Sequence, residues 1–375
     1  MRQLFVTTSL ETGGAQRALF EIIQHSNHPA EDILVIALLG SGRYSVEFDE
    51  IGVKNFSINI TSPVIGIFNF FRSIFLVRDL KPTVIQGWMY HGNLMAYLYS
   101  RFLSKDINVF WGIRQTLYDI SKEKLFTRLI INISALLSKK IHKIIYNSKL
   151  SMKQHEKFGF SETQSTFIAN GFDIEKLKFS EEKRKRIRKA FSISEDSFVI
   201  GYVGRNHPMK NISLLFDIAF DVLKQKPEIV FVIVGEGISS KFFDNKKVPK
   251  EILDRLIILG LRTDVPDLLN SFDLLCLTSK WGEGFPNVIG EAMCLSVPCV
   301  SSDVGDSKDI INGLGWIVSK NNSKDEYIKY INEASKIDKN TYMQLKSSCR
   351  KEIKDKYHIK NISYDYMKLY GVDGI

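Results

Sequence analysis

Two cations follow a short apolar run in the middle of the chain. Arg205 and Lys210 stand five residues apart behind the run Phe198–Val203. Arginine presents a planar fork of N–H donors and lysine a compact charge, and both kinds of group bind diphosphates. The spacing therefore predicts a diphosphate site at the end of a strand. A solvated loop, with Lys210 near the start of the next helix, explains the spacing equally well.

Two carboxylates follow another apolar run, Leu274–Thr278. Glu283 and Glu291 lie eight residues apart, and Pro286 between them suits the first turn of a helix, with Glu291 more than two turns inside it. The helix start is expected to turn backbone amides toward an anion, those of Phe285, Pro286, Asn287 and Val288. Both carboxylates could accept hydrogen bonds from sugar hydroxyls. The alternative is that Glu283 is only a helix-start acid and Glu291 a surface residue.

Paired glycines follow the first apolar run of the chain. Gly13 and Gly14 separate Leu4–Thr8 from the amphipathic stretch Ala15–His25. Because glycine has no Cβ, the backbone can approach a phosphate or a sugar closely there, although a tight turn uses the same residues.

Two more polar side chains stand at the ends of predicted strands. His91 follows Thr83–Met89, and Arg114 ends Asn108–Arg114. The carboxyl ends of parallel strands line ligand crevices, so His91 is a candidate catalytic residue and Arg114 a candidate substrate-binding residue. A structural role for a lone histidine such as His91 is an equally good interpretation.

The sequence has no pattern typical of a metal site. It contains no Asp-x-Asp triplet, and Cys294 and Cys299 have no second cysteine or histidine pair at zinc-site spacing. We therefore expect neither a metal nor a cofactor. The four cysteines fall in the last hundred residues, mostly among apolar neighbours, which favours a reducing compartment over a disulfide scaffold.

Short β-branched runs alternate with longer amphipathic stretches in both halves of the chain. This alternation predicts an α/β protein with two doubly wound, Rossmann-like domains that face each other across a cleft. The domains are expected at residues 1–178 and 179–356, with a helix at 357–375 packing back on the first. The charged segment Phe179–Ala190 is expected to be a solvated helix between them. The predicted strands are Leu4–Thr8, Ile33–Leu39, Val53–Asn59, Thr83–Met89, Asn108–Arg114, Lys143–Ser148, Phe198–Val203, Ile229–Val234, Leu256–Leu259, Leu274–Thr278, Cys299–Ser302 and Trp316–Val318.

Composition narrows the class of protein. The chain has 375 residues, 44% of them hydrophobic, and a net charge of +9, which suits phosphate-bearing ligands, nucleic acid or anionic lipid. A nucleic-acid partner is disfavoured because the richest basic cluster, residues 183–189, contains no aromatic side chain for stacking on bases. The apolar runs are too short or too polar for a secretory signal or a spanning helix, so a cytoplasmic location is expected.

One segment, residues 122–157, combines positive charge with apolar side chains. It holds nine basic residues against two acidic ones. Its helical stretch carries an apolar face made of Leu125, Phe126, Leu129, Ile130, Ile133, Leu136 and Leu137. This face either only covers the sheet, beneath solvated lysines, or docks the first domain on an anionic membrane surface.

Taken together, the motifs resemble the glycosyltransferase family 4 group of retaining enzymes with the GT-B fold. The resemblance implies metal-independent transfer of a sugar from a nucleotide diphosphate sugar, with the anomeric configuration kept. It implies that Arg205 and Lys210 hold the diphosphate, that Glu283 contacts the donor sugar and that Glu291 contacts the ribose. The matching segments are Gly13–Gln16, Trp88–His91, Asn170–Asp173, Val203–Arg205 with Lys210 and Asn211, Val234–Gly237, and Glu283 with Glu291.

The resemblance also bears on the remaining candidates and on the substrates. It implies that the Gly13-Gly14 loop approaches the donor phosphates and that His91 touches the donor sugar near the reacting centre. Similarity to bacterial members that build surface polysaccharide implies a polyprenyl-diphosphate-linked saccharide acceptor, an O-antigen or capsule intermediate, met at the inner face of the plasma membrane. A UDP-sugar donor is favoured over GDP-mannose. The alternative on this fold is a nucleotide-sugar epimerase or hydrolase that needs no acceptor.

Overall fold

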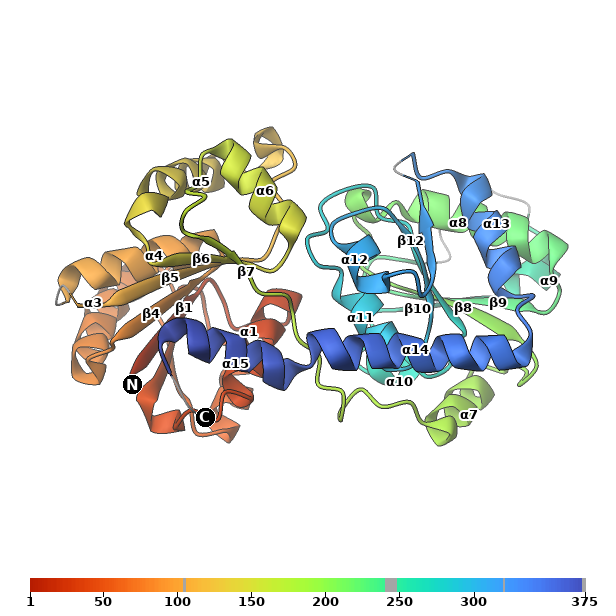
Figure 1. Ribbon diagram of the computed structural model, residues 1–375, viewed down its shortest axis with the longest axis horizontal. Coiled ribbons are helices and arrows are strands. Elements are labelled where there is room, and N and C mark those ends of the chain that lie inside the picture. The colour runs from red at the N-terminus through yellow and green to blue at the C-terminus, as the bar shows by residue number, and fades with distance from the viewer. Residues whose placement is uncertain (104–105, 240–247, 320, 373–375) are drawn as a thin grey trace. The chain divides into compact units, whose positions relative to one another are not determined.

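The computed structural model describes residues 1–103, 106–239, 248–319 and 321–372, and its chain divides into two units (Figure 1). Unit 1 comprises Met1–Gly171 and Ile359–Ile375, and unit 2 comprises Phe172–His358. Each unit is built on a parallel sheet with helices on both faces, so the prediction of two Rossmann-like domains is confirmed. Among the described residues, no helix is both long and apolar enough to cross a membrane.

The sheet of unit 1 has seven strands in the order β3-β2-β1-β4-β5-β6-β7. The strand prediction is confirmed for the first six, and the short edge strand β7 is absent from it because its three residues are only partly buried. The strands are β1 (Gln3–Thr7), β2 (Ile33–Ala37), β3 (Lys54–Ser57), β4 (Val84–Trp88), β5 (Asn108–Ile113), β6 (Lys143–Tyr146) and β7 (Ser165–Phe167).

Alternate residues of the unit 1 strands point to different helix layers. On β1, Leu4 and Val6 join the core beneath α3, α4 and α5, whereas the ring of Phe5 contacts Tyr370 of α15. The helices of this unit are α1 (Gly14–Gln24), α2 (Arg43–Glu50), α3 (Pro63–Leu80), α4 (Met89–Phe102), α5 (Leu125–Leu137), α6 (Lys149–Phe158) and α15 (Ile359–Tyr370), with 3-10 turns η1 (Ala30–Asp32), η2 (Ile120–Lys122) and η3 (Ser138–Lys140).

The sheet of unit 2 has six strands in the order β10-β9-β8-β11-β12-β13, all foreseen from the sequence. They are β8 (Phe198–Val203), β9 (Ile229–Val234), β10 (Leu256–Gly260), β11 (Leu274–Leu277), β12 (Cys299–Ser302) and β13 (Trp316–Val318). The helices are α7 (Glu181–Ala190), α8 (Ile212–Gln225), α9 (Lys250–Leu253), α10 (Val265–Leu269), α11 (Asn287–Cys294), α12 (Ser307–Ile311), α13 (Lys324–Ala334) and α14 (Lys339–Tyr357), with the 3-10 turn η4 (Pro208–Lys210).

The chain passes between the units at two points, and both differ from the expected boundaries of 178/179 and 356/357. The first lies after Gly171, because the following segment is bonded inside unit 2, where the Arg350 guanidinium donates to the carbonyls of Ile174 and Leu177 over 2.7 Å each. The second is His358, whose extended backbone forms a bridge with Phe172 and so separates α14 from α15. The helix-like pattern of the C-terminal stretch contains no sign of this break.

Candidate functional site

The carboxyl ends of β8 and β11 are neighbours in the middle of the unit 2 sheet. The chain leaves β8 toward β9 and leaves β11 toward β12, so its connections diverge between these two strands. Such a topological switch point opens a crevice in which α/β proteins bind ligands. Arg205 and Lys210 follow β8, and Glu283 follows β11. The topology thus brings the predicted cations and the first predicted carboxylate to one edge of one sheet.

Hydrogen bonds fix the loop that carries Lys210. The Thr278 hydroxyl donates to the carbonyl of Lys210 over 2.9 Å, and the amide of Lys280 donates to the carbonyl of Met209 over 2.7 Å. Asn211, the next residue, has a φ of 53°, a left-handed conformation that asparagine adopts more readily than most residues. The loop after β8 is therefore bonded to the end of β11 across the switch point.

Lys210 and Glu283 form an ion pair at this point. Lys210 Nζ lies 2.6 Å from Glu283 Oε1, and the two side chains are only 16% and 11% exposed. The Ser279 hydroxyl donates to the same oxygen over 2.7 Å. Glu283 is thus held by two donors on one oxygen, whereas no described residue bonds its Oε2. That oxygen can accept a hydrogen bond from a ligand hydroxyl.

Arg205 lies on the same loop as Lys210 but, unlike Lys210, is exposed to solvent. Its side chain is exposed, and no hydrogen bond or ion pair joins it to the part of the chain that the structure describes. The next residue is fixed, because the amide of Asn206 donates to the carbonyl of Glu236 over 2.7 Å and its side chain donates to the carbonyl of Gly237 over 3.1 Å. The loop after β8 therefore carries Lys210 as a paired cation and Arg205 as a solvated one.

The start of α11 differs from the predicted helix start in three respects. The helix begins at Asn287, with Pro286 as its N-cap rather than in its first turn, and the proline side chain makes no capping hydrogen bond. Proline has no N–H, so Pro286 donates nothing to an anion. Phe285 is 6% exposed, and its ring lies 6.1 Å from that of Phe172 and 5.5 Å from that of Tyr357. The Phe285 ring anchors the loop, so only the backbone of this residue can contact a ligand at the carboxyl edge of the sheet.

The loop before α11 passes close to the loop after β12, and a glycine allows this. Gly305 has a φ of +54°, and a Cβ there would lie 2.2 Å from the carbonyl oxygen of Gly284. The amide of Asp306 donates to that same oxygen over 2.9 Å. Any larger residue at position 305 would displace the loop that carries Glu283.

Glu291 lies further along the same helix. It is the fifth residue of α11, so it stands just over one turn from the helix start rather than more than two. It is 9% exposed, which argues against the interpretation as a surface residue.

The unit 1 sheet has its own switch point, between β1 and β4. Gly13 is the N-cap of α1, Gly14 is its first residue, and His91 is the third residue of α4. His91 is half-buried, burial lowers its pKa from the ordinary value, and its ring centre lies 6.0 Å from that of Phe126 on α5. The sequence places His91 behind a strand, and the structure shows that α4 begins two residues before it.

Arg114, at the end of β5, is engaged inside unit 1. Its guanidinium lies 4.0 Å from the centre of the Trp88 ring, donates to Asn170 Oδ1 over 2.6 Å and also donates to the Tyr366 hydroxyl. Burial lowers its pKa. These contacts join the sheet to α15, so the structure supplies Arg114 with a supporting role that the sequence does not indicate.

Two residues of these edges escape sequence reasoning. Ser279 holds Glu283, and its only sequence signal is its position directly after a strand. Asn93 is 1% exposed, and its amide group exchanges hydrogen bonds of 3.2 and 3.1 Å with the carbonyl and the N–H of Gly112. Asn93 therefore ties α4 to β5 beside the unit 1 switch point.

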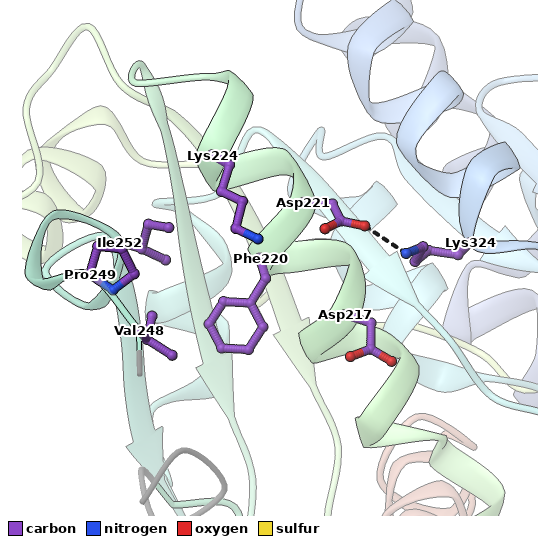
Figure 2. A pocket seen from close by; sticks show the side chains of 8 residues that line it. All are labelled: Asp217, Phe220, Asp221, Lys224, Val248, Pro249, Ile252 and Lys324. Carbon is purple, nitrogen blue, oxygen red and sulfur yellow. Dashed lines mark hydrogen bonds and ion pairs between the residues drawn. The ribbon is translucent and has the colours of Figure 1, made fainter. Parts of the chain in front are cut away.

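Unit 2 also has a pocket of about 290 Å³ that none of these residues lines (Figure 2). Its polar side chains include Asp221 and Lys324, which form an ion pair of 2.6 Å. That pair raises the pKa of Lys324, chiefly through its hydrogen bond to Asp221. The pocket is lined by Asp217, Phe220, Asp221, Lys224, Val248, Pro249, Ile252 and Lys324, none of which the sequence singles out.

Comparison with known protein families finds a match for most of unit 2. Residues 183–352 match the family described as "Glycosyl transferases group 1". Unit 2 carries a glycosyl transferases group 1 domain. This domain contains Arg205, Lys210, Glu283 and Glu291, so the switch-point edge lies inside the matched segment.

Individual proteins that are similar to this chain are also named as glycosyltransferases. A UDP-Gal:alpha-D-GlcNAc-diphosphoundecaprenol alpha-1,3-galactosyltransferase of Escherichia coli is 29% identical over 51% of this chain and 50% of its own length. The lipopolysaccharide core biosynthesis mannosyltransferase LpsB of Rhizobium meliloti is 24% identical over 41% of this chain and 45% of its own. The chain thus spans about half the length of these curated relatives. The crystal structure of Anabaena HepE in complex with UDP matches with a TM-score of 0.82, 20% identity and coverage of 99% of this chain and 100% of HepE, a likeness of fold.

Proposed function

We propose that this chain is a retaining glycosyltransferase of bacterial surface-polysaccharide synthesis. The observation that carries the proposal is the Lys210–Glu283 ion pair, at the switch point of a glycosyl transferases group 1 domain. The pair supports the proposal because a cation that could bind a leaving diphosphate is hydrogen-bonded to a carboxylate that could accept from a sugar hydroxyl.

The donor is a nucleotide diphosphate sugar. Arg205 and Lys210 bind the diphosphate, with the start of α11 as a third source of positive potential. Glu283 binds the transferred sugar through Oε2, and the nearly buried Glu291 binds the ribose. The name of the Escherichia coli relative, which includes UDP-Gal, favours a UDP-sugar. GDP-mannose is the second candidate, and one relative is named as a mannosyltransferase.

The reaction needs a stabilised leaving group more than it needs a protein nucleophile. The acceptor hydroxyl oxygen bonds to the anomeric carbon on the face from which the diphosphate departs, and the hydroxyl proton passes to a diphosphate oxygen. Fixed cations and amides stabilise the charge that develops on that oxygen. Because these groups supply positive charge, we propose that turnover does not require a divalent metal.

Unit 1 takes the acceptor side. Gly13 and Gly14 give a ligand access to the backbone before α1, and His91, whose pKa burial lowers, contacts sugar hydroxyls near the reacting carbon. The acceptor is a polyprenyl-diphosphate-linked saccharide, which the name of the Escherichia coli relative supports. Such an acceptor places the protein at the inner face of the plasma membrane.

Transfer from radiolabelled donors tests the proposal. The purified protein is incubated with UDP- and GDP-sugars, with and without an undecaprenyl-diphosphate-linked saccharide, and lipid-extractable label is measured. We expect label in lipid only when the acceptor is present. Release or isomerisation of sugar at full rate from the donor alone would instead identify an epimerase or a hydrolase.

A further inference from the structure

Helix α3 of unit 1 presents a row of apolar side chains to solvent. Val64, Ile67, Phe68, Phe71 and Phe75 are 81%, 63%, 68%, 57% and 68% exposed. Their spacing of three and four residues places them on one face of the helix. We call these five residues the α3 stripe. Single exposed apolar residues are common on protein surfaces, but a contiguous row that includes three phenylalanines marks an interaction surface.

The opposite face of α3 is already occupied by the core. Ser73 and Val77 are fully buried, and Phe70, Ile74 and Leu80 pack on the core of unit 1. The Ser73 hydroxyl bonds to that of Tyr99 on α4, which fixes α3 to its neighbour. The α3 stripe therefore does not fold inward, and a surface helix of this kind normally carries polar residues at those positions.

The neighbouring helices α4 and α5 also carry exposed apolar side chains. Helices α3, α4 and α5 cover the same face of the sheet, because all three contribute to one core. On α4, Leu98 and Phe102 are exposed, and α5 adds Leu125, Phe126, Leu129 and Leu136. The apolar face predicted for α5 is thus divided, since Ile130 is buried in the core. The α3 stripe, which the sequence does not predict, is the longer exposed row.

Basic residues outnumber acidic ones among the exposed charged residues on and beside these helices. The exposed charged residues of α3 and of the ends of α4 and α5 are mainly basic: Arg72, Arg78, Lys81, Arg101, Lys124, Lys139 and Lys140, against Asp79 and Asp106. Apolar side chains rimmed by lysine and arginine are complementary to an anionic lipid surface, where chains enter the acyl boundary and cations meet the headgroups.

We propose that the α3 stripe inserts into the interface of an anionic bilayer, with the basic rim bound to its headgroups. This inference does not depend on the proposed reaction, because it rests on exposure and charge in unit 1 alone. It extends the membrane contact predicted for residues 122–157 to a surface centred on α3.

Vesicle co-sedimentation of the full chain tests the proposal. Phosphatidylcholine vesicles are compared with vesicles containing 30 mol% phosphatidylglycerol, at low and at high salt. We expect binding to the anionic vesicles that weakens with salt. The variant F68S/F71S/F75S should bind roughly a hundredfold more weakly, since each half-exposed phenylalanine is worth about fivefold in partitioning. The control L253S/L261S/M343S, which removes exposed apolar residues of unit 2, should bind like the parent.

The charge component has its own matched pair of variants. K124E/K139E/K140E should weaken binding about a hundredfold or more, because each basic residue at an anionic surface contributes about fivefold. K185E/K189E/K354E makes the same change of net charge on exposed residues of α7 and α14 and should have little effect. Circular dichroism and thermal unfolding confirm that each variant is folded.

A fluorophore locates the contact. All four native cysteines are buried, so F71C can be labelled selectively with an environment-sensitive dye, and V46C on α2 provides an exposed control. We expect a blue shift with anionic vesicles for the dye at position 71 alone. The proposal is overturned by equal binding to neutral and anionic vesicles, by parent-like binding of the phenylalanine variant, or by a shift at position 46 only. It is also overturned if the stripe drives only self-association without vesicle binding.

Discussion

Arg205 and Lys210 are assigned the same ligand, yet the structure predicts that their removal has different effects on stability. Lys210 Nζ lies 2.6 Å from Glu283, and both side chains are nearly buried. A hydrogen bond to a charged group contributes about 1.5–3 kcal/mol, and its loss leaves a carboxylate with only the Ser279 hydroxyl as donor. Arg205 is exposed without a described partner, so its removal should change stability by less than about 0.5 kcal/mol.

The expected result is a separation of stability from activity. Lys210→Ala should lower the free energy of unfolding by about 2 kcal/mol, which for a domain of this size lowers Tm by roughly 4–8 °C. Arg205→Ala should leave Tm unchanged. Both should reduce turnover at least roughly a hundredfold, since each removes a cation from the leaving diphosphate.

Thermal unfolding and steady-state kinetics on the same preparations provide the measurement. The double variant Lys210→Ala/Glu283→Gln is the control, because it removes both charges and should regain part of the stability lost by Lys210→Ala. The reasoning fails if Lys210→Ala unfolds at the parent temperature, if Arg205→Ala is markedly destabilised, or if either variant retains parent turnover with saturating donor.

Other predictions address the carboxylates, the metal and a buried histidine. Glu283→Gln should lower kcat more than Glu291→Gln, whose loss should appear mainly in the donor KM; an unchanged kcat for Glu283→Gln would reverse the two roles. Turnover in excess chelator should match turnover without it, and restoration of lost activity by added Mg²⁺ would disprove metal independence. Burial lowers the pKa of His155 to about 4, below its unfolded value of about 6.5. The contribution of His155 to the free energy of unfolding is therefore fully present above pH 6.5 and falls by roughly 3 kcal/mol as the pH drops to 4. His155→Gln should remove that share of the pH dependence in urea titrations, and an unaltered profile would contradict it.

The sequence predicts the central strands of this protein well because they are buried on both faces. Runs such as Ile229–Val234 are continuously apolar and β-branched, which is typical of central parallel strands. Helix α3 is not predicted for the opposite reason. It is apolar on its core face and on its outer face, so the periodicity that marks a surface helix is missing.

The site is predictable as a set of residues but not as a set of bonds. A strand followed by Arg205 and Lys210, and another followed by Glu283, indicate that all three belong to a sheet edge. That Lys210 and Glu283 pair depends on β8 and β11 being neighbours, and strand order is not encoded in any local pattern. The role of Gly305 cannot be predicted from the sequence for the same reason, because Gly305 and the Gly284 carbonyl become neighbours only in the folded chain.

The central claim is that the carboxyl edge of unit 2 binds a nucleoside diphosphate. Isothermal titration calorimetry of UDP and GDP, with uridine and guanosine as controls and a chelator present, tests it most directly. We predict that one diphosphate binds far more tightly than its nucleoside. Arg205→Ala should weaken the diphosphate roughly 10- to 100-fold while leaving the nucleoside unaffected, as expected for one charge-assisted contact. Equal affinities for diphosphate and nucleoside, or parent affinity in Arg205→Ala, would contradict the claim.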